Sequence, residues 1–204
     1  MPTALVRNGR IVTASESYEA DLYVDGARIA LVGQGLSLPA DTVIDASGCL
    51  VLPGGIDAHT HLDMPAGPLT SADDFETGTR AAAFGGTTTV IDFATPEPGQ
   101  SLLAALDSWR RKAEGQAVVD YGFHMALREV GETTLAEMAR LTRDEGVASF
   151  KLYLAYPGVL QVDDAAFFRA LLGARECGAL PLVHAENGGV IDVLVKRALA
   201  RGET

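Results

Sequence analysis

The chain is poor in cysteine, tryptophan and histidine, and it has no long apolar run. Its 204 residues include 2 cysteines, 1 tryptophan and 4 histidines. Cys49 and Cys177 lie far apart and lack the spacing of a disulfide framework or a cysteine-based metal site, so we expect two reduced thiols. No stretch approaches the roughly 18 apolar residues of a membrane-spanning helix. The N-terminus lacks a basic start followed by a signal-like apolar run, so we expect a cytoplasmic protein.

Basic residues are also scarce, with 16 lysines and arginines against 27 acidic residues and a net charge of -11. Nucleic acids and anionic membrane surfaces select for basic patches, so neither is an expected partner. The short basic run Arg110-Arg111-Lys112 is interpreted as a solvated helix face. A hydrophobic content of 48%, with 22 glycines and 9 prolines, is typical of a globular protein and argues against disorder and coiled coil.

Residues 1–52 read as short strands joined by turns. Asn-Gly and Asp-Gly between short apolar runs are strong hairpin signals, so we expect turns at Asn8-Gly9 and Asp25-Gly26. The expected strands are Ala4–Val6, Ile11–Thr13, Asp21–Val24, Arg28–Val32 and Thr42–Asp45.

Residues 53–204 alternate between apolar strands and helices, which predicts a parallel sheet. Ser, Thr and Asp caps mark helix starts, and glycines mark helix ends. The expected strands are Gly55–Ala58, Thr87–Phe93, Val118–Leu127, Ala148–Leu154 and Leu180–His184. The expected helices are Ser71–Phe84, Ser101–Glu114, Thr133–Glu145, Asp163–Cys177 and Gly188–Arg201.

Chemistry-bearing residues occur at or near the ends of these strands. His59 and His61 are two residues apart, so in an extended strand both imidazoles point to one side, as a metal site requires. Lys151 lies inside an apolar strand, and His184 ends another. Each also has an ordinary interpretation: a surface or hydrogen-bonded histidine pair, a lysine that snorkels or pairs with an acid, and a hydrogen-bonded core histidine.

The blocks PGGIDAHTHLDMP (53–65), SADDFETGTRAAAFGGTTTVIDF (71–93), DYGFHMAL (120–127), SFKLYLAYPGVLQVDD (149–164) and LVHAENG (182–188) resemble the amidohydrolase superfamily, and within it the hydantoinase/dihydropyrimidinase family. The resemblance implies the N-terminal part of a metal-dependent (β/α)8 TIM barrel at 53–204, preceded by part of a small β-sandwich at 1–52. A complete barrel needs eight strands and about 250 residues, whereas only about five βα units are expected here. We therefore expect a portion of a longer protein; the alternative is a doubly wound sheet that folds by itself.

The resemblance also implies a ligand set. His59 and His61 would hold one of two divalent metal ions and His184 the other, with zinc as the expected metal. Lys151, carboxylated by carbon dioxide, would bridge them. Tyr156 would help to hold the oxyanion, although simple packing on its loop is the alternative and Pro157 departs from the usual family pattern. Met64 and Phe93 would line the substrate pocket.

Three further residues near the expected site keep open roles. Asp63 and Asp92 would either orient ligand histidines or cap turns. His124 is interpreted as a core residue, since the family pattern places no ligand in its block.

The implied function is hydrolysis of the cyclic amide bond of dihydropyrimidines or 5-substituted hydantoins by a metal-bridging hydroxide. The expected partner is thus a small cyclic ureide, with a homotetramer implied by resemblance. The alternatives are an allantoinase- or dihydroorotase-like enzyme, a non-catalytic dihydropyrimidinase-like scaffold, or an inactive fragment. No histidine follows His184, and no later aspartate lies on an expected strand, so we expect weak binding of at most one metal and negligible turnover by these residues alone.

Overall fold

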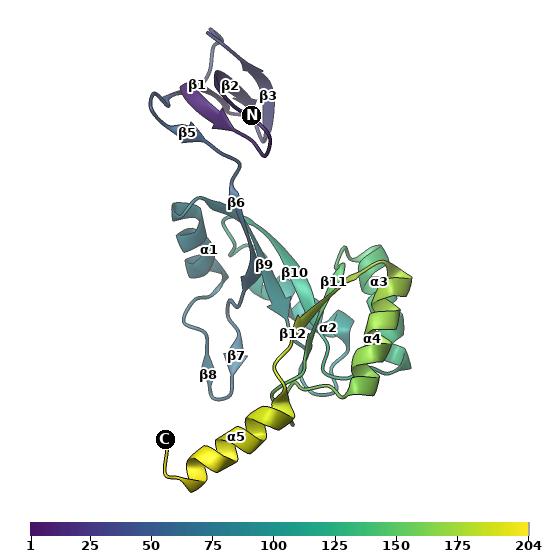
Figure 1. The fold of residues 1–204 in the computed structure, drawn as a ribbon. Helices are drawn as coiled ribbons and strands as arrows, with labels where there is room; N and C mark the ends of the chain where they lie inside the picture. The colour runs from purple at the N-terminus through teal and green to yellow at the C-terminus, as the bar shows by residue number, and fades with distance from the viewer. Residues whose placement is uncertain (204) are drawn as a thin grey trace. The chain divides into compact units, whose positions relative to one another are not determined.

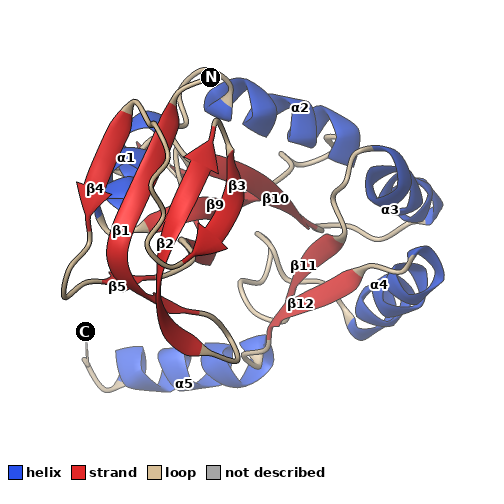
Figure 2. Cartoon of the chain, turned by 90° about the horizontal axis from the view of Figure 1, so that it is seen from above, coloured by secondary structure: helices blue, strands red, loops and turns tan. Residues whose placement is uncertain are grey.

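The computed structural model describes residues 1–203, which divide between Gly54 and Gly55 into two compact units. The first unit is a sheet in the order β3-β2-β1-β4, with a further strand, β5, also paired to β1 (Figure 2). Strands β1, β2 and β3 are antiparallel, whereas β4 and β5 run parallel to β1. The strands are β1 (Thr3–Val12), β2 (Ser17–Asp25), β3 (Arg28–Gly33), β4 (Thr42–Asp45) and β5 (Leu50–Val51).

The predicted turn at Asn8-Gly9 is wrong, because the segment is a β-bulge inside the continuous strand β1. Asn8 has a φ of 62°, the left-handed conformation that asparagine tolerates well. A Cβ on Gly9 would lie 2.5 Å from Val51 Cγ2, so the close approach of β5 requires glycine. The second predicted turn, at Asp25-Gly26, does join β2 to β3.

The second unit is built on a five-stranded, wholly parallel sheet in the order β12-β11-β10-β9-β6 (Figure 1). Its strands are β6 (Gly55–Thr60), β9 (Thr87–Ala94), β10 (Asp120–Ala126), β11 (Ser149–Tyr153) and β12 (Leu180–His184). The sequence did not predict a small hairpin formed by β7 (Pro65–Ala66) and β8 (Leu69–Thr70). The first helix starts later than expected, because Ser71 is paired with Met64 at the base of this hairpin and Asp74 caps the helix.

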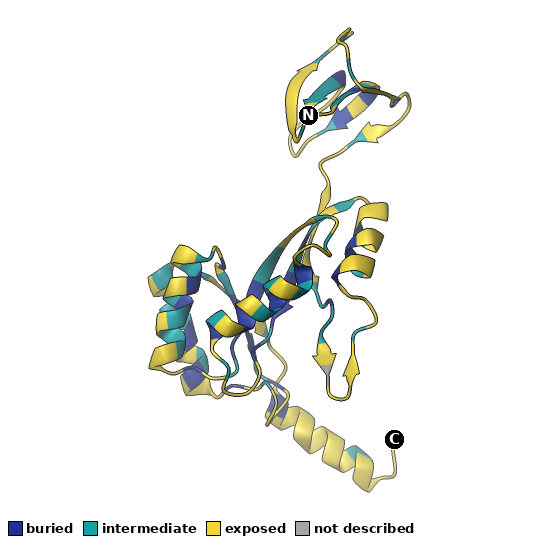
Figure 3. Cartoon of the chain, turned by 180° about the vertical axis from the view of Figure 1, so that it is seen from behind, coloured by how far each residue is buried: buried dark blue, intermediate teal, exposed yellow. Residues whose placement is uncertain are grey.

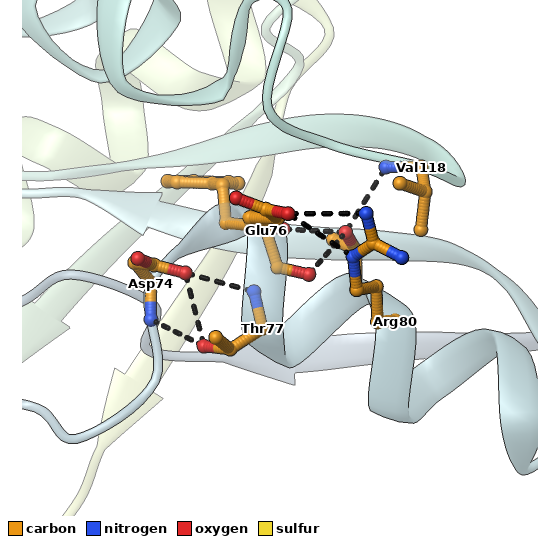
Figure 4. Close-up of polar contacts among 7 residues, drawn as sticks. Asp74, Glu76, Thr77, Arg80 and Val118 are labelled. Atoms are coloured by element: carbon orange, nitrogen blue, oxygen red, sulfur yellow. Dashed lines mark hydrogen bonds and ion pairs between the residues drawn. The ribbon is translucent and has the colours of Figure 1, made fainter.

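Five helices follow the strands in turn: α1 (Phe75–Phe84), α2 (Leu102–Ala113), α3 (Glu132–Asp144), α4 (Asp164–Cys177) and α5 (Gly188–Ala200). The side chain of Asp74 accepts from the backbone N–H of Thr77, and the Thr77 hydroxyl accepts from that of Asp74, which fixes the start of α1 (Figure 4). None of the helices in residues 1–203 combines the length and apolarity that crossing a bilayer requires.

The core of this unit lies between one face of the sheet and helices α1 to α4. Val90, Met125, Phe150 and Leu152 project from β9, β10 and β11 into one cluster with residues of these helices, such as Trp109. A doubly wound sheet would have helices on both faces, so this alternative is not observed. The βα order and one-sided helical layer confirm the predicted fold, the first βα units of a (β/α)8 barrel.

Helix α5 does not join this core. Gly188 is its buried residue, and the remainder is mostly exposed (Figure 3). Val190, Val193, Leu194 and Leu199 are each more than half exposed.

Candidate metal centre

The candidate site lies on the sheet face opposite the helices, because strand alternation separates the two sets of side chains. On β11, Phe150 and Leu152 enter the core, so Lys151 and Tyr153 point the other way. Residues paired in register on parallel strands share a face. Tyr153 is paired with His184, and His124 with Phe93, so all four side chains belong to this same face.

His59 and His61 lie together at the end of β6, with ring centroids 5.2 Å apart. Both rings pack on Phe93, at 4.6 Å and 5.0 Å between centroids. The Nδ1 atom of His61 is buried and has no hydrogen-bond partner among residues 1–203. Burial is the main cause that lowers the pKa of His61, which favours the neutral imidazole that a metal ion needs.

Lys151 lies beside this pair and is only 7% exposed. Its Nζ is 5.7 Å from the centroid of the Phe93 ring and 5.2 Å from that of Tyr153. Within residues 1–203 no carboxylate forms an ion pair with it. Burial therefore lowers the pKa of Lys151, and no paired carboxylate opposes this shift. The neutral amine is favoured as a result.

His184 belongs to a second group of side chains. Its ring is 5.9 Å from that of Tyr153 and 5.2 Å from that of Tyr156, and its Nε2 is 2.5 Å from an Oε atom of Glu186. Tyr156 is 46% exposed and has a φ of 66°, so its ring is held beside His184 by a strained backbone. Burial also raises the pKa of Tyr153, which lies between Lys151 and His184.

The structure thus brings His59, His61 and Lys151 together around Phe93, and places His184 beside Tyr156. Within residues 1–203, no three side chains of histidine, cysteine, aspartate or glutamate gather closely enough to hold a metal ion. Tyr153 was not singled out from the sequence, although its position two residues after Lys151 places it on the same face.

His124 differs from His61 because both of its ring nitrogens have partners. One contacts the Ser149 hydroxyl at 2.5 Å and the other the carbonyl oxygen of Ala58 at 2.9 Å. The residue is 8% exposed. It therefore links β10 to β6 and β11 and offers no free nitrogen to a ligand.

Neither Asp63 nor Asp92 forms a hydrogen bond to a histidine ring. Asp92 is fully buried and accepts hydrogen bonds from groups around the end of β6. Asp63 pairs with Lys112 at 3.3 Å, and Arg110 pairs with Glu145 at 2.7 Å. Arg111 is exposed, as expected for a solvated face, whereas Arg110 and Lys112 are partly buried and also connect α2 to other segments.

Of the predicted pocket residues, Phe93 is 1% exposed and Met64 is partly buried next to the β7–β8 hairpin. A cleft of about 320 Å³ lies beside Tyr156, and its lining includes Pro157, Glu186, Ile191 and Val195. Neither His59 nor His61 lines this cleft.

Comparison with known proteins gives consistent similarities. The profile of the amidohydrolase family matches residues 50–203. The D-hydantoinase of Geobacillus stearothermophilus is 52% identical over 202 residues, which cover 99% of this chain and 43% of that protein. The dihydropyrimidinase of Rattus norvegicus is 42% identical, and the match covers 98% of this chain and 40% of that protein.

Solved structures agree. The crystal structure of dihydropyrimidinase from Brevibacillus agri superposes with a TM-score of 0.96 at 48% identity, and the match covers 99% of this chain and 44% of that one. This chain therefore spans less than half the length of each of these three relatives.

Proposed function

Because the chain belongs to the amidohydrolase family, as its motifs predicted, we propose that it carries part of the metal site of a cyclic amidohydrolase. The proposed reaction of the natural protein that contains it is hydrolysis of the ring amide of dihydropyrimidines or 5-substituted hydantoins. The support is similarity throughout the chain to proteins named D-hydantoinase and dihydropyrimidinase. A cytoplasmic homotetramer, with residues 1–52 as part of a β-sandwich, is included in the proposal and rests on the resemblance alone.

The donor set of this chain fits a divalent metal. Members of the amidohydrolase family generally bind divalent ions. His61 presents a buried nitrogen that has no partner in the described part of the chain, and such an atom costs free energy unless a ligand satisfies it. Neutral imidazoles with oxygen ligands suit zinc. The residues that would hold two such ions are His59, His61, Lys151 and His184.

When bound, the two ions would activate water as a nucleophile and polarise the ring carbonyl. Lys151 can contribute only after modification, because an ammonium repels cations. Its lowered pKa favours the free amine, which adds carbon dioxide: an N–C bond forms, the nitrogen loses a proton, and an anionic carbamate results. This group presents two oxygens, so it can serve two cations.

Tyr156 would donate its phenolic hydrogen to the oxygen of the ring carbonyl as negative charge develops there. Its exposed ring beside His184 supports this role. Met64 and Phe93 would shape the substrate pocket, Phe93 mainly by its packing against His59 and His61.

The orphaned Nδ1 of His61 is the observation that carries the metal proposal, and it leads to a direct test. Zinc binding would be measured calorimetrically on the wild-type chain and on His59→Asn, His61→Asn and His184→Asn, with bicarbonate supplied. We expect each substitution to weaken binding, by roughly tenfold or more for His61→Asn. Unchanged zinc affinity in all three variants would overturn the proposal.

The substrate class needs a separate measurement. In the natural protein that contains this sequence, dihydrouracil and hydantoin should be hydrolysed and Lys151→Met should abolish the reaction. A preference for allantoin or dihydroorotate would show instead that the protein is an allantoinase- or dihydroorotase-like enzyme. If a metal-loaded protein hydrolysed none of these rings, a non-catalytic scaffold would be favoured. The presence of His59, His61, Lys151 and His184 now counts against that alternative.

A further inference from the structure

The carboxylate of Asp92, on β9, accepts four hydrogen bonds. One oxygen accepts from the Thr60 hydroxyl at 3.0 Å and the Leu62 backbone N–H at 2.7 Å. The other accepts from the backbone N–H of Phe93 at 2.8 Å and the Trp109 indole at 3.2 Å. The side chain has no exposed surface, and three elements or loops converge on it.

The contacts with Thr60 and Leu62 are notable because these residues flank His61 on either side. Asp92 does not touch the His61 imidazole by a hydrogen bond. It holds the Thr60 hydroxyl on one side of that residue and the Leu62 backbone N–H on the other, while Phe93, the residue that follows Asp92, stacks on the ring. Backbone direction and ring rotation of His61 are thus set from one point of β9.

Helix α2 adds a second attachment one residue further along. The Nζ atom of Lys112 donates to the carbonyl oxygen of Asp63 at 2.6 Å and lies 4.4 Å from the centroid of the Trp109 ring. Asp63 has a φ of 47°, a left-handed backbone conformation. Trp109 and Lys112 are one helical turn apart, so a single face of α2 holds both Asp92 and the turn after His61.

We propose that Asp92, supported by Trp109 and Lys112, is a positioning residue that holds the His61 imidazole with its free nitrogen ready for a divalent cation. This inference rests on the proposed function, in which His61 is a metal ligand. Asp92 acts through the Thr60 hydroxyl, the Leu62 backbone N–H and the packing of Phe93, and it does not itself bind the cation.

The requirement for a carboxylate follows from the hydrogen bonds. All four partners are donors, and the carboxylate of Asp92 accepts at both oxygens. The amide of asparagine has the same shape but only one accepting oxygen. In Asp92→Asn the NH2 group must face either the Thr60–Leu62 pair or the Phe93–Trp109 pair, and buried donors there lose their partner.

The test uses cobalt(II) as the probe, titrated into the chain and followed by visible absorption. We expect Asp92→Asn to weaken cobalt affinity by roughly tenfold, a common cost of losing an outer-sphere partner. Thr60→Val, which removes only one donor, should give a smaller loss. A second measurement needs no metal: in the nitrogen NMR spectrum of the histidine rings, Asp92→Asn should shift the signals of His61 more than those of His184.

Thr79→Val is the matched control, because it removes another buried hydroxyl of the same unit. Thr79 lies on α1. Its hydroxyl donates to the carbonyl of Phe75 and accepts from the Val118 N–H at 3.0 Å, and neither of these partners is next to a histidine in the sequence. We expect it to lower stability but to leave cobalt affinity within about twofold. An equal loss of affinity in Thr79→Val and Asp92→Asn would overturn the proposal, since the effect would then follow stability alone.

Two further outcomes separate this inference from the proposed function. If His61→Asn leaves cobalt binding unchanged, the ligand role of His61 fails and the positioning role falls with it. If His61→Asn removes binding while a folded Asp92→Asn binds like wild type, only the positioning role fails. Should Asp92→Asn not fold, Trp109→Phe and Lys112→Met decide, and wild-type affinity and histidine spectra in both would overturn the proposal.

Discussion

The ring of Phe93 stacks on the imidazole of His61, with 5.0 Å between the centroids and 27° between the planes. The same ring contacts His59 and His124, at 4.6 Å and 4.8 Å. An aromatic residue predicted to line a pocket is therefore the surface against which three of the 4 histidines are placed.

Removal of this ring should cost stability as well as metal binding. We expect Phe93→Ala to lower the free energy of unfolding by about 3–5 kcal/mol, because a large buried side chain leaves a cavity. Phe93→Leu, which keeps apolar volume, should cost less. Urea unfolding, followed by the fluorescence of Trp109, the single tryptophan of the chain, measures the free energy of unfolding of both variants. A stable Phe93→Ala variant would contradict the packing role.

Lys151 should oppose stability in the metal-free chain, because burial disfavours its charge and no acidic partner compensates within the described residues. We expect Lys151→Met, which keeps an unbranched chain, to raise the free energy of unfolding by roughly 1 kcal/mol. The same variant should lose the carbamate carbon signal that carbon-13 bicarbonate would give in the wild type. A destabilised Lys151→Met would mean that the ammonium has a favourable contact after all.

Tyr156 presents a similar conflict between backbone and site. Its left-handed conformation is unfavourable for a residue with a Cβ, so Tyr156→Gly should stabilise the unit by about 1 kcal/mol. Tyr156→Phe keeps the strain and loses only the hydroxyl, so its stability should match the wild type. In the natural protein, both variants should lower kcat for hydantoin, by roughly 100-fold for a lost oxyanion donor. Full activity of Tyr156→Phe would remove the phenol from the mechanism.

Much of the fold was predictable because strand and helix periods are local properties. The strand Leu180–His184 was predicted with its observed bounds, and the alternation rule correctly placed the side chains of His59 and His61 together. The bulge at Asn8-Gly9 was not predictable in this way. An Asn-Gly pair permits a turn or a bulge, and the choice depends on pairing with strands β4 and β5, which lie far along the chain.

The contacts that hold the candidate site in place could not be predicted either, because they also join residues far apart in the sequence. Asp92 could be suspected as a polar residue near the histidines, but its four donors come from separate parts of the unit. Lys112 resembled a surface residue because helix periodicity does not reveal that the turn at Asp63 lies within its reach. Long-range contacts of this kind appear only once the chain is folded.

Asp21 gives a pH-dependent prediction for the first unit. This buried carboxylate accepts hydrogen bonds at 2.8 Å from the backbone N–H groups of Asn8, in the bulge, and of Leu36. The bond from Asn8 is the largest cause, followed by that from Leu36, and together they lower the pKa of Asp21 below its ordinary value of 3.8.

A carboxyl whose folded-state pKa is depressed stabilises the fold fully above its unfolded pKa, and that stability is lost as the pH falls through the folded pKa. At neutral pH, Asp21→Asn should therefore unfold the bulge more easily and speed amide hydrogen exchange at Asn8 and Leu36. Exchange within α2, in the other unit, serves as the internal control. The difference between variant and wild type should shrink below pH 3.8 and vanish once Asp21 is protonated in the folded state. A difference that stays constant with pH would mean that the side-chain amide is tolerated no worse than the acid, and that the charge of Asp21 does not hold the bulge.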